Sequence, residues 1–194
     1  MYAESYLIQY HNLIKNGDVV VGYWIRKEIE NLVADLDDPA YIYDMDEAHK
    51  RIRFMQTYCL QSKHPYFGKP VQLMPWQLAF FEALYAFKMA DTGLRRFVEA
   101  LLEIARKNGK STMLAADGNT DLFIGTGGSE ICCASNDDKQ CKYIWREIAG
   151  MRARLDPKKA ITSQNLVEIR NNLKNIIVSR MSSRTQNKDG GNYT

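Results

Sequence analysis

Apolar residues in the first part of the chain recur every three to four positions, which is the period of an amphipathic helix. Gly17 follows the first of these stripes as a candidate C-cap, and Pro75 fits the first turn of the last one. Asp44 or Asp46 can cap the third. The pattern therefore predicts helices along residues 6–14, 25–36, 48–59 and 76–87.

The pattern changes after Gly93. Arg96 to Ile104 is a compact apolar run with the length of a buried strand, although its alanine and leucine content also permits a helix. Alternation of strands and helices beyond it predicts the α/β class. We expect an incomplete, P-loop-type parallel sheet over residues 94–194, behind a helical region over residues 1–93. The expected helices cover residues 112–123 and 137–151, and the expected strands cover residues 131–134, 166–169 and 175–179.

Composition narrows the class of protein further. The 194 residues are 45% hydrophobic and 25% charged, which suits a globular chain with a core rather than a disordered one. Apolar runs fall short of the roughly 18 residues that cross a membrane, and the N-terminus lacks a secretory pattern, so we expect no membrane association. The four cysteines show no C-x-x-C spacing, which favours reduced thiols over a zinc or disulfide framework.

Charge is distributed unevenly along the chain. Residues 1–93 carry 9 basic and 12 acidic side chains, whereas residues 94–194 carry 17 and 11. The excess is concentrated in residues 139–188, which contain 12 basic and 3 acidic side chains. A basic half is typical of proteins that bind a nucleotide or nucleic acid, and a well-solvated surface is the alternative interpretation.

The sharpest chemical signal is Gly109-Lys110-Ser111, between the apolar run and the next expected helix. A phosphate-binding loop needs backbone N–H groups at a helix N-terminus, a lysine that reaches the β and γ phosphates, and a hydroxyl that holds Mg²⁺. These three residues supply such groups in the required order. Ile104 stands where the standard pattern has its first glycine, so the loop is a deviant one, and an ordinary Asn-Gly turn is the alternative.

The residues around this loop resemble those of the large terminase subunits of tailed bacteriophages. Glu103-Ile-Ala-Arg-Lys-Asn-Gly-Lys-Ser-Thr112 is similar to the deviant Walker A motif of that family. Upstream, Tyr66-Phe-Gly-Lys-Pro-Val-Gln-Leu-Met-Pro-Trp-Gln77 resembles the segment that ends in its Leu-x-Pro-Trp-Gln element. Residues 40–60 resemble the helix that precedes this segment.

The resemblance extends beyond the loop. Ala134-Ser-Asn-Asp-Asp-Lys-Gln140 is similar to the polar stretch after the family's second strand, with Cys141 in place of the usual alanine. The family couples ATP hydrolysis to the packaging of double-stranded DNA into a preformed capsid. The resemblance therefore implies a P-loop ATPase that uses ATP and Mg²⁺ in the cytoplasm of a bacterial host. It also implies the small terminase subunit and the portal as partners, and a homo-oligomeric ring of the full-length protein.

The same resemblance implies roles for individual residues. Gln77 would read the adenine edge, Lys110 would contact the β and γ phosphates, and Ser111 would hold Mg²⁺. Arg106 lies inside the loop, where an arginine can stabilise charge on the γ phosphate; an arginine of a neighbouring subunit is the alternative. Lys110 and Arg106 are thus the expected catalytic residues. The other residues expected to contact the nucleotide or to shape the loop are Lys107, Asn108, Gly109 and Thr112.

Two parts of the family's machinery have no counterpart in this sequence. A Walker B motif needs about four apolar residues that run into Asp-Glu, and no such run follows Gly109. In the family this motif follows a glycine-containing loop that resembles Lys188-Asp-Gly-Gly191. The nuclease carboxylates belong to a further domain. We therefore expect the chain to be an N-terminal part of a motor ATPase that binds nucleotide but turns it over slowly.

Other interpretations remain open. A different P-loop enzyme, such as a helicase-like ATPase or a small-molecule kinase, would share the loop, and a non-enzymatic interaction module would carry it as a vestige. The three scattered histidines predict no metal site, and Cys132 and Cys133 suit core thiols. One basic cluster suits a solvated helix end, with DNA phosphates or a neighbouring motor subunit as the alternative partner; it consists of Arg152, Arg154, Lys158 and Lys159.

Overall fold

The computed structural model describes residues 4–182 of the chain. These residues form two compact units: unit 1 contains the described residues up to 53 together with 72–103, and unit 2 contains 54–71 together with those from 104 onward. The expected domain boundary between residues 93 and 94 stays a prediction. The Gly-containing stretch Lys188-Asp-Gly-Gly191 and the polar tail around it lie outside the described residues.

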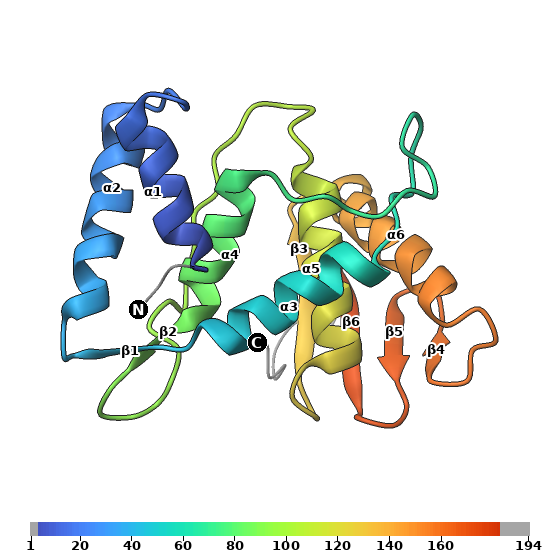
Figure 1. Ribbon diagram of the computed structural model, residues 1–194. Helices are drawn as coiled ribbons and strands as arrows, with labels where there is room; N and C mark the ends of the chain where they lie inside the picture. The colour runs from blue at the N-terminus through green and yellow to red at the C-terminus, as the bar shows by residue number, and fades with distance from the viewer. Residues whose placement is uncertain (1–3, 183–194) are drawn as a thin grey trace. The chain divides into compact units, whose positions relative to one another are not determined.

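Unit 1 is built mainly from helices, as the hydrophobic pattern predicts. Helices α1 and α4 pack side by side, and α2 packs against α1 (Figure 1). A short antiparallel ribbon of β1 and β2 is also part of this unit. The pattern did not predict it, because three-residue strands carry too few positions to show alternation. The elements are α1 (Tyr6–Asn16), α2 (Tyr23–Ala34), η1 (Asp35–Asp37), β1 (Tyr41–Tyr43), α4 (Pro75–Ala86), β2 (Phe87–Met89) and the start of α3 (Met45–Tyr58).

Local signals explain where these helices begin and end. The Ser5 hydroxyl accepts a hydrogen bond from the Ile8 N–H at 3.2 Å and so caps α1. Gly17 ends α1 with φ of 82°, a left-handed conformation that glycine adopts without steric cost. Asp44 accepts from the Glu47 N–H at 3.2 Å at the start of α3. The C-cap predicted at Gly17 and the cap predicted at Asp44 are confirmed.

A buried carboxylate ties the start of α1 to α4. Glu82 of α4 has no exposed surface, yet it is surrounded by hydrogen-bond donors. A buried charge is tolerated only when such groups replace its hydration. The groups around it are the Ser5 hydroxyl, the N–H groups of Tyr6 (2.8 Å) and Leu7 (3.2 Å), the Tyr43 hydroxyl (2.5 Å) and His49 Nε2 (2.6 Å).

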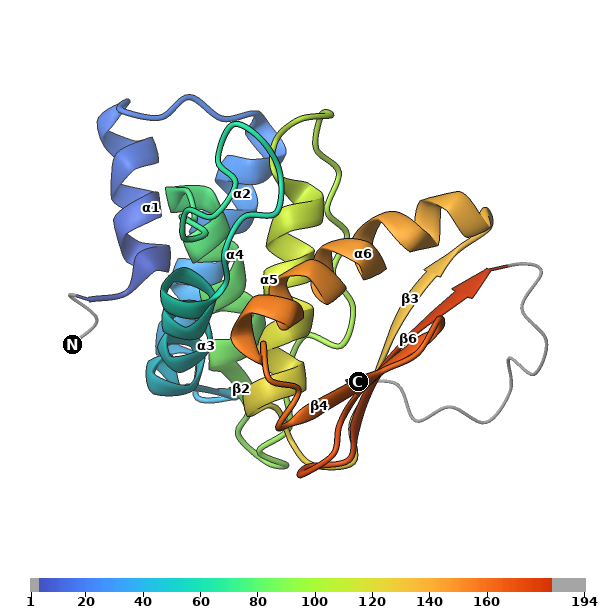
Figure 2. The same cartoon turned by 90° about the vertical axis from the view of Figure 1, so that its right-hand side faces the viewer.

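Unit 2 is a four-stranded sheet with two helices on one of its faces (Figure 2). The strand order is β3-β6-β5-β4, with β3 and β6 parallel and the other neighbours antiparallel. The α/β class is confirmed, and the sheet is mixed because the last three strands follow one another through short turns. The elements are α5 (Lys110–Ile124), β3 (Glu130–Ser135), α6 (Asp138–Leu155), β4 (Thr162–Gln164), β5 (Glu168–Asn171) and β6 (Ile176–Ser182).

One predicted strand does not form. Apart from a single bridge between Lys88 and Arg95, residues 95–104 carry no strand pairing in the described structure. Val98 and Leu101 are 86% and 93% exposed. The strand prediction over 96–104 is wrong for this structure, because an extended segment becomes a strand only where a neighbouring strand offers its hydrogen-bonding edge.

A second buried carboxylate joins the end of α6 to β4. Asp156 follows the last residue of α6, is 5% exposed, and accepts hydrogen bonds from the N–H groups of Ala160, Ile161 and Thr162 and from the Thr162 hydroxyl. Burial by itself would raise the pKa of Asp156, but these bonds outweigh it and lower the pKa to about 2.

The helices of residues 4–182 do not include a candidate for a membrane span, since none combines the necessary length with a sufficiently apolar composition.

Replacing Glu82 by alanine is expected to destabilise the chain by about 3 kcal/mol or more, because the donors around it lose a buried acceptor. Urea denaturation followed by circular dichroism measures the change. Glu28→Ala removes a carboxylate from an exposed position of α2 and serves as the control, with an expected change within about 0.5 kcal/mol. Equal effects of the two substitutions would contradict the anchoring role of Glu82.

Asp156 should make the stability of the chain depend on pH in the acid range. The folded pKa of about 2 lies below the ordinary value of 3.8, so acidification protonates the unfolded chain first. The advantage of the wild type over Asp156→Asn is therefore complete above about pH 4 and is lost as the pH falls towards 2. Urea denaturation of both proteins across this pH range measures the difference in their free energies of unfolding. A difference that does not change with pH would refute the prediction.

Candidate functional site

The predicted phosphate loop has a backbone conformation with two left-handed residues. Lys107 has φ of 71° and Gly109 has φ of 76°, directly before α5 begins at Lys110. Asn108 Nδ2 donates a hydrogen bond to the Ala105 carbonyl at 3.2 Å and so closes the turn on itself. A lysine in the left-handed conformation is uncommon. Left-handed residues that alternate with right-handed ones along the backbone turn successive N–H groups towards one side, as in anion-binding nests.

The N-terminus of α5 leaves backbone donors free. The Met113 N–H donates to the Gly109 carbonyl at 2.9 Å and makes the first hydrogen bond of the helix. The N–H groups of Lys110, Ser111 and Thr112 have no backbone acceptor within residues 4–182. Gly109 occupies the N-cap position and has no side chain to cap these groups. Three free donors at the positive end of a helix form a site suited to an anion.

Three cations surround these donors. Arg106, Lys107 and Lys110 are exposed, and none of them forms an ion pair or hydrogen bond with the side chains that the structure describes. Ser111 lies in the first turn of α5 with its side chain half-buried. Cations without carboxylate partners, next to free N–H groups, favour the binding of a multiply charged anion such as a polyphosphate.

The helix that carries the loop is held firmly in unit 2. Gly118 of α5 lies so close to α6 that a Cβ atom there would be 2.9 Å from the Ile148 Cδ1 atom. Asn119 Nδ2 donates to the Ile148 carbonyl at 3.2 Å, and Asn171 Nδ2 of β5 donates to the Leu122 carbonyl at 2.8 Å. The sequence analysis missed these residues, although an asparagine in a helix interior is a signal of such a role because its helix propensity is low.

Gln77 lies in unit 1, whereas the loop belongs to unit 2. Its side chain is 5% exposed, and its Oε1 accepts a hydrogen bond from the Met74 N–H at 2.8 Å. Pro75 occupies the first turn of the same helix, as predicted. Gln77 thus caps α4 in this structure, and its role as an adenine reader stays a prediction.

Several other candidates have structural roles. Arg152 is 5% exposed and donates to the Thr162 hydroxyl and to Gln164 Oε1, which places it inside the fold. Arg154 lies over the Phe67 ring at 4.2 Å. Of the basic cluster, only Lys158 and Lys159 are exposed without such contacts in the described structure. Two of the four residues in this cluster are therefore engaged in contacts within the protein, which leaves Lys158 and Lys159 as candidates for a contact with DNA.

The four cysteines are free thiols. Burial raises the pKa of Cys133 to about 12, and burial together with the charge of Asp117 does the same for Cys59. Such thiols are poor nucleophiles at neutral pH. Within the described part of the chain, no cluster of His, Cys, Asp and Glu side chains could hold a metal ion.

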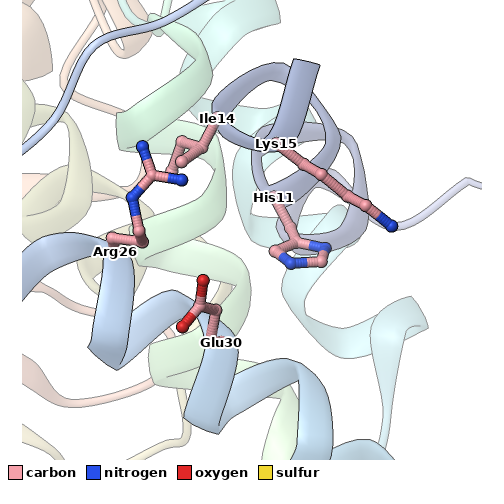
Figure 3. A pocket seen from close by; sticks show the side chains of 5 residues that line it. All are labelled: His11, Ile14, Lys15, Arg26 and Glu30. Carbon is pink, nitrogen blue, oxygen red and sulfur yellow. The ribbon is translucent and has the colours of Figure 1, made fainter. Parts of the chain in front are cut away.

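A pocket in unit 1 opens between α1 and α2 (Figure 3). His11, Ile14 and Lys15 line it from α1, and Arg26 and Glu30 line it from α2. None of the predicted site residues contributes to this pocket, so it has no part in the predicted phosphate chemistry.

Known proteins share both the sequence pattern and the fold. The family described as "Terminase large subunit, ATPase domain" matches residues 75–194. The crystal structure of the HK97 bacteriophage large terminase is similar to this chain, with a TM-score of 0.60 and 23% identity. The similarity covers 74% of this chain and 29% of that one, and at this identity it shows a common fold. None of the curated proteins is a match for this chain.

Proposed function

Because the chain belongs to the family of terminase large-subunit ATPase domains, we propose that it binds ATP with Mg²⁺ as part of a motor that packages DNA. The observation that carries this proposal is the loop before α5, where left-handed residues occur together with N–H groups and cations that have no partner in the described part of the chain. The chain spans 29% of the length of the HK97 terminase, so the activity of a whole motor is part of the proposal.

Each loop residue has a chemical task in this proposal. Lys110 reaches the β and γ phosphates, while Gly109 and Thr112 present N–H groups to phosphate oxygens. Arg106 has no carboxylate partner among residues 4–182 and can stabilise the charge that develops on the γ phosphate. Lys107 and Asn108 maintain the shape of the loop, the first by its left-handed backbone and the second by its bond to the Ala105 carbonyl.

Two further residues are proposed to hold Mg²⁺ and to recognise the adenine base. Ser111 has a hydroxyl in the first turn of α5, which is the position suited to Mg²⁺, and the ion would neutralise charge on the β and γ phosphates when bound. We also propose that Gln77 recognises the adenine base, through the amide group that its bond to Met74 leaves available at Nε2. The support for this role of Gln77 is the Pro-Trp-Gln element.

The wider partners follow from the family. We propose double-stranded DNA as the cargo, the small terminase subunit and the portal as protein partners, and a ring of copies as the working assembly. A helicase-like enzyme or a kinase would share the phosphate loop, but the family match over residues 75–194 favours the packaging motor.

Mg²⁺-ATP is expected to bind this chain with micromolar to sub-millimolar affinity, and Lys110→Ala should weaken binding about tenfold or more, because it removes a charged hydrogen bond to phosphate. Isothermal titration calorimetry measures both constants. Lys158→Ala removes the same charge from an exposed position after α6 and should bind as the wild type does. Equal affinities of Lys110→Ala and wild type would refute the loop as the phosphate site.

Steady hydrolysis by the 194-residue chain is expected to remain near the background of the Lys110→Ala variant. The sequence after Gly109 contains no apolar run that ends in Asp-Glu, so we expect it to lack the carboxylate that activates the attacking water. A phosphate-release assay with both proteins measures the rate. Turnover on the order of 10 s⁻¹, which is typical of enzymes, would show that another residue performs this task.

A further inference from the structure

The helix α6 has one buried face and one exposed cationic face. Cys141, Trp145 and Ile148 are buried and face the rest of unit 2. On the opposite side, Lys139, Tyr143 and Arg146 are exposed and follow one another at spacings of four and three residues. Tyr143 is 57% exposed, and neither of the two cations forms an ion pair with a described side chain. Spacing of this kind places the three side chains in one stripe.

The second half of α6 is covered by the loop of residues 59–71, which belongs to the same unit. Glu147 of α6 accepts a hydrogen bond from the Ser62 hydroxyl and pairs with Lys63. Farther along the helix, Arg154 donates to the Gln61 carbonyl at 3.4 Å. These contacts fix the loop next to the exposed stripe, since Glu147 directly follows Arg146 in the helix.

The loop itself presents aromatic and basic side chains to solvent. Residues 63–70 are all exposed and contain no acidic residue. Tyr66 and Phe67 are 54% and 65% exposed, and Lys69 Nζ lies 5.8 Å from the centre of the Tyr66 ring. Exposed aromatic rings that alternate with cations are unusual on a surface that contacts only water.

The acidic residues of this region do not neutralise its surface. Residues 139–182 contain 10 basic and 3 acidic side chains. Glu147 and Asp156 are 4% and 5% exposed and are used in internal hydrogen bonds, and Glu168 is the third acid. Just before this range, the exposed Asp137 accepts a hydrogen bond from the Lys139 N–H at 3.0 Å as the N-cap of α6. The outer surface of this region is therefore more cationic than the sequence alone suggests.

We propose that the exposed stripe of α6 and the adjoining loop form one binding surface for the sugar–phosphate backbone of DNA. The surface, called here the basic strip, consists of Lys139, Tyr143, Arg146, Tyr66 and Lys69. The three cations pair with phosphates, and the two tyrosines pack against sugars or bases. Asp137 caps the N-terminal end of α6 by accepting from the Lys139 N–H, so the side chains of the strip, rather than the end of the helix, supply the attraction. The proposal rests on the proposed function in one respect, namely that DNA is the polyanion that such a motor handles.

Fluorescence anisotropy of a labelled DNA duplex and of its single strand tests the basic strip. Binding by the wild-type chain should weaken between about 50 and about 200 mM salt, since phosphate contacts release counterions. The double variant Lys139→Ala/Arg146→Ala should bind about tenfold or more weakly at low salt, and the slope of log K against log salt should fall by about 1.8.

A charge-matched control separates the basic strip from net charge. Lys15→Ala/Lys27→Ala removes two exposed lysines from α1 and α2 of unit 1 and should bind DNA as the wild type does. Equal loss in the two double variants, or wild-type binding by Lys139→Ala/Arg146→Ala, would overturn the proposal. So would binding of polyglutamate as tight as that of DNA, which would indicate an acidic protein as the partner.

Tyr143→Ala distinguishes the two forms of DNA. A greater loss on the single strand than on the duplex would show that the ring stacks on bases, whereas equal losses would show contact with the backbone of the duplex. No loss on either would remove Tyr143 from the strip.

Nucleotide binding, measured in parallel, separates this proposal from the proposed function. Lys139→Ala/Arg146→Ala should retain Mg²⁺-ATP binding, which also shows that it is folded, and Lys110→Ala should retain DNA binding. Loss of DNA binding in Lys110→Ala would show that the phosphate loop, rather than the strip, holds the DNA.

Discussion

The close contact between α5 and α6 is the constraint on which the arrangement of unit 2 depends. Gly118 allows the two helices to approach until the Ile148 side chain occupies the space of a Cβ atom. Asn119 then connects the two helices through the Ile148 carbonyl, and Asn171 connects α5 to the sheet. A helix held at its middle and at its end keeps its N-terminus in one place. The free N–H groups before Met113 are therefore presented by a rigid element, as preorganised binding requires.

The phosphate loop differs from this anchoring in how its polar groups are hydrogen-bonded. The anchoring pairs the Nδ2 groups of Asn119 and Asn171 with backbone carbonyls, whereas the loop leaves donors at the start of α5 without an acceptor in residues 4–182 and places Lys107 in a left-handed conformation. Unpaired donors and uncommon backbone angles carry a free-energy cost that the rest of unit 2 must offset. A bound polyphosphate would supply the missing acceptors. The donors at the start of α5 that have no acceptor in the described structure are the main structural argument for a ligand at this place.

Acidic residues play a similar part in both units. Glu82 ties the start of α1 to α4, Glu147 holds the loop of residues 59–71 on α6, and Asp156 connects α6 to β4. Each is almost completely buried, and each accepts hydrogen bonds from more than one group. Because Glu147 and Asp156 of unit 2 are buried, they contribute little negative charge to the surface around Arg146. The electrostatic character of the surface is thus a consequence of how the interior is built.

The helices, and the hypothesis of a phosphate-binding loop, follow from short stretches of the sequence. Helical periodicity needs only neighbouring positions, and the caps at Gly17 and Asp44 act within one turn, so these features could be predicted locally. Gly109, Lys110 and Ser111 likewise lie next to one another, and their types indicate phosphate binding before any fold is known.

The remaining features depend on contacts between distant parts of the chain. The mixed sheet and the unpaired state of residues 96–104 depend on which strand edges meet, and the burial of Arg152 depends on Thr162 and Gln164 packing over it. The anchoring of α5 requires Asn171, 49 residues beyond its partner Leu122. Such contacts join residues that are distant in the chain, and a pattern of neighbouring positions carries no information about which distant groups will be in reach.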